Sequence, residues 1–423
     1  MFLCPVTLPA RLTLLCATSM LGLGACAGDT DGAGAGLPEV ADRAPLVRDS
    51  AGVEVRIHPA AALDVIWDVD PTPVIRLDGS EGGLELFHLI ASMTFESDST
   101  FLLGEMAMTR VRRFTLGGDL VATIGRPGEG PGEFGALNAL GFVADSLVVF
   151  DSRWNRISVF GPARAFARTT TLEPGRFGQR SRFQGLFADG RILSSTHPAG
   201  TEAVWVVHDP SGRALSRVDG VSPPPEMVMR LLGPGSSGAG EPMTPLLPVP
   251  RLVVVGRGLV SVPGDSWDVE WRTIDGLLLG IDRVDLPVPA FTEPMQVAWR
   301  EGMEAGLDPD NPNAEALRRM WAEAVMPETL PVLGGGRAIG GAATVIEDDM
   351  GRLWVSTYSA DEAIQTWLLF GQGRLQGRVQ LPEGMELHAV QGDLLLGVQV
   401  DDFDVQYAVI YRLGHARPSV RER

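Results

Sequence analysis

The sequence has no cysteine after residue 26, because its three cysteines are Cys4, Cys16 and Cys26. The chain after Cys26 can therefore form no internal disulfide, and it has neither a thiolate zinc site nor a cysteine nucleophile. Lysine is absent, so all 35 basic residues are arginine, and no basic cluster is longer than Arg112-Arg113. With a formal net charge of -18, this pattern excludes electrostatic capture of nucleic acid, and we expect no nucleic-acid partner.

Sequence signatures of common catalytic sites are missing as well. The chain has no G-x-S-x-G motif, and its six histidines show no spacing that would place two of them on one face. We therefore predict no catalytic residues and no cofactor. Two of the scattered histidines, His197 and His388, are the ones that could converge on a common axis.

The N-terminal segment resembles a lipoprotein signal. An apolar stretch from Leu12 to Leu23 is too short for a membrane-spanning helix and has the proportions of a secretory signal. It ends in Leu23-Gly24-Ala25-Cys26, which resembles a bacterial lipobox. The resemblance implies a signal peptide at 1–25, a lipid on Cys26 and a flexible tether at 26–43. It also implies an extracytoplasmic lipoprotein anchored in a membrane, and Ala27 favours the outer membrane or the cell surface.

The remainder of the chain repeats itself. Residues 101–114 align without gaps with residues 147–160, and the apolar run, the acid, the arginine and the final phenylalanine coincide. Weaker copies bring the number of units to six. Each unit is a set of short strands with a period of about 40 to 50 residues, which is typical of a propeller blade. We predict an all-β, six-bladed β-propeller over 44–414 with a tail at 415–423, closed by pairing of Val53–Ile57 with the last unit.

Residues 124–160 resemble the NHL repeat, whose pattern is a G-x-G-P-G-x-F turn, an apolar strand and then D-x-x-x-N-R-I-x-x-F. The match is close over 124–160, partial over 87–124 and weak elsewhere. The resemblance implies a six-bladed ring of the kind found in scaffolds, sensor ectodomains and a few enzymes. Gly125–Phe134 lacks the Lys-Ser/Thr of a phosphate-binding loop, so we interpret it as a turn between blades. The recurring acid and arginine pairs are interpreted as structural ion pairs.

A helical hairpin interrupts the strand pattern at about 292–325. Asn311 followed by Pro312 is typical of a helix start. Apolar residues at helical spacing give each helix one apolar face, which either covers a mouth of the ring or buries hydrophobic surface. If these faces bind a partner, the contact residues are Trp299, Met303, Met320 and Trp321.

Three carboxylates within four residues, Asp401, Asp402 and Asp404, are the candidate ligands for a divalent cation, and a solvated acidic loop is the competing interpretation. We expect a membrane-anchored propeller that acts as a binding scaffold for a small ligand or an envelope protein. Two alternatives stay open. One is a metal-dependent enzyme similar to lactonases or hydrolases, and the other is a structural component of an envelope complex.

Overall fold

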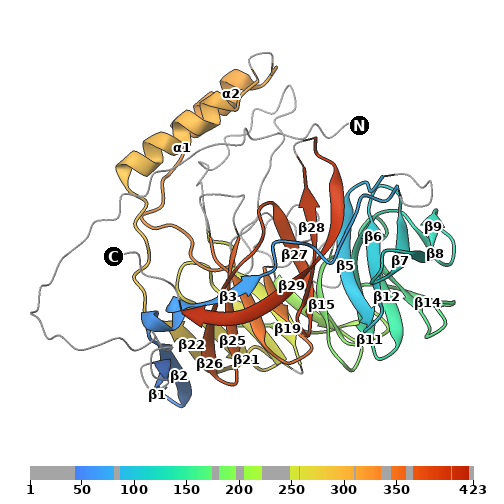
Figure 1. Ribbon diagram of the computed structural model, residues 1–423, viewed down its shortest axis with the longest axis horizontal. Helices are drawn as coiled ribbons and strands as arrows, with labels where there is room; N and C mark the ends of the chain where they lie inside the picture. Colours follow the sequence, from blue (N-terminus) through green and yellow to red (C-terminus); the bar gives the residue numbers. More distant parts are fainter. Residues whose placement is uncertain are drawn as a thin grey trace, which may run out of the picture.

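The strands form six antiparallel blades around an axis, within the part of the chain that the structure describes (Figure 1). The computed structural model describes residues 43–80, 86–173, 181–196, 204–221, 248–256, 258–308, 311–334, 344–358, 365–401 and 403–418. The inner strands of neighbouring blades contact one another all the way around, so the ring is closed. The all-β, six-bladed β-propeller is confirmed.

The blades follow one another in chain order, and the strands of each blade run in sequence from the axis outwards. Blade 1 is β5 (Ile90–Ser97), β6 (Thr100–Glu105), β7 (Arg110–Thr115) and β8 (Leu120–Ile124); blade 2 is β11 (Leu137–Val143), β12 (Ser146–Asp151), β13 (Arg156–Phe160) and β14 (Phe166–Thr171); blade 3 is β15 (Ser181–Leu186), β16 (Ile192–Thr196), β17 (Val204–His208) and β18 (Ala214–Val218). Blade 4 is β19 (Arg251–Val255), β20 (Gly258–Val262), β21 (Asp268–Arg272) and β22 (Leu278–Val284); blade 5 is β23 (Val345–Glu347), β24 (Leu353–Ser356), β25 (Thr366–Gly371) and β26 (Arg374–Gln380). Blade 6 is β27 (Met385–Gln391), β28 (Leu394–Val400), β29 (Gln406–Pro418) and, from the start of the chain, β4 (Ile75–Leu77).

The repeat found in the sequence corresponds to the second and third strands of blades 1 and 2. In β12 every side chain from Leu147 to Phe150 is buried. Leu147 and Val149 belong to the core shared with blade 1, whereas Val148 and Phe150 belong to the core shared with blade 3. Because neighbouring blades cover both faces of each sheet, the second strands are continuous apolar runs instead of alternating ones.

Ring closure differs from the prediction. The strand predicted at Val53–Ile57 forms as β2 (Val53–His58), but it pairs in parallel with β22 on the outer edge of blade 4. The outer strand of blade 6 is instead β4, in which Leu77 pairs with Ala408 of β29. Alternating polar and apolar residues identify a strand but carry no information on its partner, and for this reason the predicted pairing was wrong.

The remaining N-terminal elements lie along the outer edges of the blades. A hairpin of β1 (Leu46–Ser50) and β2 extends blade 4, and a short 3-10 helix (Ala60–Asp64) leads to β3 (Val65–Val69). β3 joins blades 5 and 6, because it pairs with both β26 and β29. β29 continues to Pro418, so the sheet extends four residues into the region predicted as a tail.

The helical insertion also forms, as α1 (Glu293–Ala305) and α2 (Ala314–Ala322). Its two ends are held together where the chain leaves and re-enters the ring, because the amide of Phe291 donates to the carbonyl of Glu328 at 2.9 Å. α2 begins two residues later than predicted. The side chain of Asn311 accepts a hydrogen bond from the amide of Asn313 at 2.9 Å and forms a turn ahead of the helix. No helix in the described residues is long and apolar enough to cross a membrane.

A buried polar network fixes the N-terminal hairpin to blade 4. The carboxylate of Asp282 accepts hydrogen bonds from Nε and Nη2 of Arg56, both at 2.7 Å, and from Nε1 of Trp271 at 2.6 Å. His58 is fully buried, and its Nδ1 accepts a hydrogen bond from the amide of Leu375, so its Nε2 donates to Asp282 at 2.7 Å. Burial alone would raise the pKa of Asp282, but these donors outweigh it and lower the pKa to about 2.

We predict that Asp282→Asn lowers the free energy of unfolding by about 2–4 kcal/mol, because three donor side chains lose their charged acceptor. The folded-state pKa of Asp282 is depressed, so its contribution is present above about pH 4 and is lost as the pH falls through 2. Urea titrations of both proteins at several pH values would measure the difference between their free energies of unfolding. This difference should be constant near neutrality and shrink below pH 4. Asp275→Asn, on an exposed turn of the same blade, is the control and should change little. Equal stability of Asp282→Asn and the wild type at pH 7 would contradict this role.

Candidate functional site

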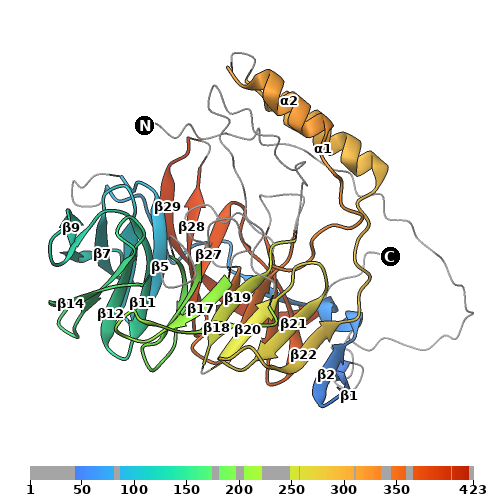
Figure 2. The same ribbon diagram turned by 180° about the vertical axis from the view of Figure 1, so that it is seen from behind.

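The two faces of the ring differ sharply in the length of their connections. In a blade of four antiparallel strands, the links between strands one and two and between strands three and four emerge on one face, which we call the turn face. The remaining links, including those between blades, emerge on the other, which we call the insertion face. The helical hairpin between β22 and β23 lies on the insertion face (Figures 1 and 2).

The Gly-rich segment on the insertion face is a structural turn, as predicted. It forms two short parallel strands, β9 (Arg126–Pro127) and β10 (Glu133–Phe134). Phe134 is fully buried between blades 1 and 2. Gly125 has a φ of 77°, and a Cβ at this position would overlap the ring of Phe134. Glycine is therefore required both by the backbone conformation and by the ring packed against it.

The recurring acid and arginine pairs are structural too. Glu105 is fully buried and accepts hydrogen bonds from Nε of Arg110 at 2.8 Å and from Nε of Arg112 at 2.7 Å. Asp151 accepts from the amide of Gly135 at 2.8 Å, and Nε of Arg156 lies 3.5 Å from its carboxylate. Glu105 links the end of β6 to the third strand of its blade, and Asp151 links the end of β12 to the loop before β11, which confirms the interpretation made from the spacing.

The helical hairpin carries the four residues predicted as partner contacts. α1 has no buried residue, and Trp299 and Met303 are half-buried. On α2, Met320 is half-buried and Trp321 is only 8% exposed. Both views show the two helices lying away from the blades (Figures 1 and 2). A contact role for these four residues stays a prediction.

The candidate cation ligands lie in the loop between β28 and β29, also on the insertion face. Asp401 uses one carboxylate oxygen to accept from the amides of Phe403 at 2.9 Å and Val405 at 3.0 Å, and the hydroxyl of Tyr407 donates to the other at 3.0 Å. Asp402 lies outside the described residues, and Asp404 has a φ of 60°. No group of three metal-ligating side chains comes together in the described part of the chain. Cation binding by this loop stays a prediction.

His388 lies on an inner strand, where β27 carries a bulge between Leu387 and Ala389. β15, in the opposite blade, has a corresponding bulge at Gln184. Burial lowers the pKa of His388 to about 4, so the imidazole is neutral at pH 7. His197, the other histidine expected at the axis, lies outside the described residues.

One residue at the inner strands was missed by the sequence analysis. Arg251 begins β19, and its Nε is buried with no hydrogen-bond partner among the described residues. Burial lowers the pKa of its guanidinium group. An arginine directly before the apolar run Leu252–Val255 was the available signal, but the run by itself does not show that the arginine is buried.

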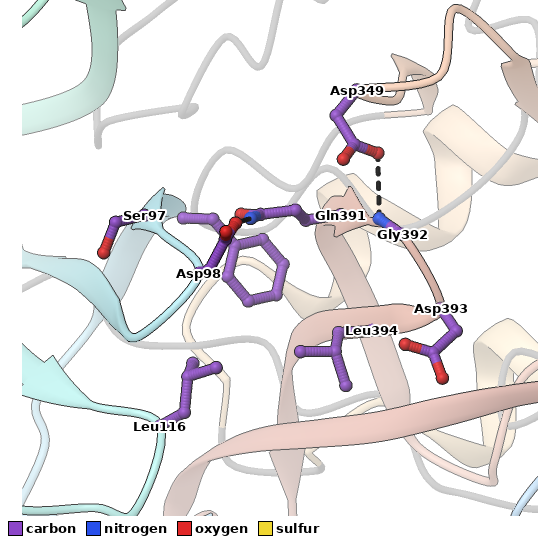
Figure 3. Close-up of a pocket in the computed structure, with 9 residues that line it drawn as sticks. Ser97, Asp98, Leu116, Asp349, Gln391, Gly392, Asp393 and Leu394 are labelled. Carbon is purple, nitrogen blue, oxygen red and sulfur yellow. Dashed lines mark hydrogen bonds between the residues drawn. The ribbon is translucent and has the colours of Figure 1, made fainter.

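The turn face carries a small pocket of about 190 Å³ between blades 1, 5 and 6, lined by both apolar and polar side chains (Figure 3). The side chain of Gln391 donates to Asp98 at 2.7 Å, and the amide of Gly392 donates to Asp349 at 2.8 Å. Asp393 pairs with Arg412. Asp98 and Asp349 thus connect blade 6 to its neighbours, and Asp393 pairs within blade 6.

No protein-family model matches the chain, and no curated protein matches it in sequence. Solved structures with a similar arrangement include a candidate exported protein from Bacteroides fragilis, at 12% identity and a TM-score of 0.46 over 85% of this chain and 100% of that one. A member of the DUF4221 family from Bacteroides vulgatus aligns at 10% identity and a TM-score of 0.48 over 84% and 99% of the two chains. Regucalcin, a calcium-binding protein from Agrobacterium tumefaciens, aligns at 13% identity and a TM-score of 0.36 over 84% and 98%. Likeness at this level carries no information on ligand or activity.

We predict that the stability of the protein falls as the pH drops from about 6.5 towards 4, partly through His388. Its folded-state pKa lies below its ordinary value, so the unfolded chain binds the proton first and protonation favours unfolding. The free energy of unfolding of the wild type should fall between pH 7 and pH 5, and His388→Gln should make this fall smaller by about 2 kcal/mol. Urea unfolding at the two pH values measures it. His415→Gln, on an exposed residue, is the control. An unchanged pH dependence in His388→Gln would show that the imidazole is not desolvated.

Proposed function

We propose that the protein is an extracytoplasmic lipoprotein, anchored through a lipid on Cys26, whose propeller binds a protein or a small ligand with its insertion face. The observation that carries this proposal is the asymmetry of the ring. Among the described segments, the helical hairpin emerges on one face, whereas the links between strands one and two on the opposite face are short turns. Binding residues concentrate in loops that a rigid scaffold holds in place, and this ring is such a scaffold.

The hairpin is the part of this face best suited to a protein partner. The segments through which it leaves and re-enters the ring are joined by an isolated bridge between Ala290 and Thr329. Beyond that point α1 buries no residue, although Trp299 and Met303 lie on it. Apolar side chains displayed on a projecting element are typical of interaction surfaces rather than of a core.

The anchor fits the same arrangement. The lipobox at Leu23–Cys26 and the Gly/Ala-rich stretch after it supply a tether, and the described chain begins at Arg43, directly before the hairpin that extends blade 4. The NHL-like pattern of residues 124–160 also supports a scaffold, since that resemblance includes sensor ectodomains. The outer membrane or cell surface is the proposed location.

The two alternatives from the sequence are distinguished by simple outcomes. A metal-dependent enzyme requires a stoichiometric metal in the purified protein, and a chelator should then lower its melting temperature. A structural component of an envelope complex requires one stoichiometric partner that co-purifies with it.

We predict that Cys26→Ala abolishes lipidation. Cells grown with labelled palmitate should incorporate the label into the wild-type protein and not into the variant, because the lipid is attached to this cysteine. Cys16→Ala, inside the predicted signal peptide, is the matched control and should keep the label. A labelled Cys26→Ala protein would refute the anchor.

We also predict that Trp299→Ala combined with Met303→Ala weakens partner capture at least tenfold while leaving the melting temperature nearly unchanged. Both side chains are half-buried on a helix without buried residues, so little core packing is lost. Quantitative cross-linking in intact cells, followed by mass spectrometry, measures the capture. The control is Leu277→Ser, which removes a 68% exposed apolar side chain from the turn face. Loss of capture in Leu277→Ser but not in the hairpin variant would place the interface on the turn face and contradict the proposal.

A further inference from the structure

A second cavity, of about 360 Å³, lies on the turn face between blades 1 and 2. Its walls combine charged and apolar groups, and its volume falls in the range of small-molecule sites. The lining residues are Glu96, Ser97, Arg113, Asp145, Pro162, Ala163 and Arg164. Because the helical hairpin emerges on the opposite face, this cavity is separate from the proposed binding surface.

Two arginines at this cavity are fixed by one buried carboxylate. The side chain of Glu96 is 5% exposed, and one of its oxygens accepts from Nε of Arg164 at 2.6 Å. The other oxygen accepts from Nε of Arg113 and from the hydroxyl of Thr100, the latter at 2.7 Å. Burial would raise the pKa of Glu96, but these three donors outweigh it and lower the pKa, so the group is a carboxylate.

The backbone is irregular at both ends of the Glu96–Arg164 ion pair. Glu96 is the extra residue of a bulge in β5, between Phe95 and Ser97, and a bulge redirects the side chain that it carries. Arg164 has a φ of 60° in the turn between β13 and β14. An arginine in this left-handed conformation is strained, and such strain persists where the surrounding structure imposes it.

The other blades show what this turn normally contains. The turns that link the third and fourth strands of blades 1, 3 and 4 have the same pair of backbone hydrogen bonds, and at the position of Arg164 they place Gly118, Gly212 and Gly276. These glycines have φ values of 95°, 85° and 91°. Glycine adopts this conformation without strain, so blade 2 has an arginine where the fold itself favours glycine.

The two arginines keep hydrogen-bonding capacity beyond the bonds that they make to Glu96. Among the described residues, Arg113 hydrogen-bonds only through Nε, and its side chain is 33% exposed. Arg164 uses Nη1 for the carbonyls of Asp145, at 2.7 Å, and Gly161, at 3.3 Å, which leaves Nη2. Two guanidinium groups face the buried carboxylate of Glu96 at the cavity wall, and with the second carboxylate, Asp145, the formal charges of the lining side chains sum to zero. Asp145 is exposed at the rim.

We propose that this cavity binds a small ligand through a carboxylate or phosphate group held between Arg113 and Arg164. Guanidinium groups fixed at Nε present their remaining N–H groups in the planar geometry that oxyanions accept. Pro162 and Ala163 form an apolar wall beside them, which fits a ligand with a compact apolar body. Glu96 positions both arginines.

Calorimetric titration of the detergent-solubilised lipoprotein with inorganic phosphate, and separately with succinate, tests this site at constant ionic strength. Saturable binding of either anion is expected, and the one that binds identifies the group. Arg164→Gly restores the glycine of the other blades, so the turn should form without strain while affinity falls at least tenfold. Arg113→Gln should have the same effect and leaves the turn untouched, so it tests the site even where Arg164→Gly lowers the melting temperature.

Arg168→Gln is the matched control, because Arg168 lies on β14 of the same blade and bonds to Thr170 and Pro210 outside this cavity. Its affinity should equal that of the wild type. The proposal is overturned if neither anion binds saturably, or if Arg164→Gly and Arg113→Gln bind as tightly as the wild type. Either result would make the Glu96 cluster a link between two blades and nothing more.

Discussion

The fold depends on the pairing of β4 with β29, which joins the two ends of the propeller. Leu77 pairs with Ala408 and Ile75 with Ile410, and both β4 side chains are buried in the core between blades 6 and 1. Every other core formed by the described residues likewise lies between two neighbouring blades, so each blade buries its apolar faces against its neighbours. Closing the ring removes the two free faces that an open array of blades would expose. The contact spans most of the chain, and its formation orders segments far apart in sequence.

Closure also determines where the chain can vary. Once the strand order of each blade is set, links between blades must emerge on the insertion face, and long segments can be added there without disturbing a core. The helical hairpin occupies such a position. On the turn face the links are short, and function there requires side chains placed by local irregularities of the backbone. The bulge at Glu96 and the left-handed Arg164 are such irregularities.

Much of the fold could be predicted from the sequence because the repeat is local. The runs at 101–114 and 147–160 lie in the second and third strands of their blades, and the helices formed within two residues of their predicted starts. Features that depend on partners distant in sequence could not be predicted. The partner of β2, the burial of Arg251 and the meeting of Glu96 with Arg164 follow from how blades pack against each other. The spacing of residues along one strand does not predict these contacts between strands.

Hydrogen exchange of backbone amides under native conditions, followed by mass spectrometry, tests ring closure most directly. If β4 completes blade 6, amides of Ile75–Leu77 and of Ala408–Ile410 should be protected as strongly as those of Leu147–Phe150, and all three should exchange only through global unfolding. Rapid exchange of Ile75–Leu77 while blade 2 stays protected would show that the ring is open at this seam. The account of a ring closed by β4 would then lose its basis.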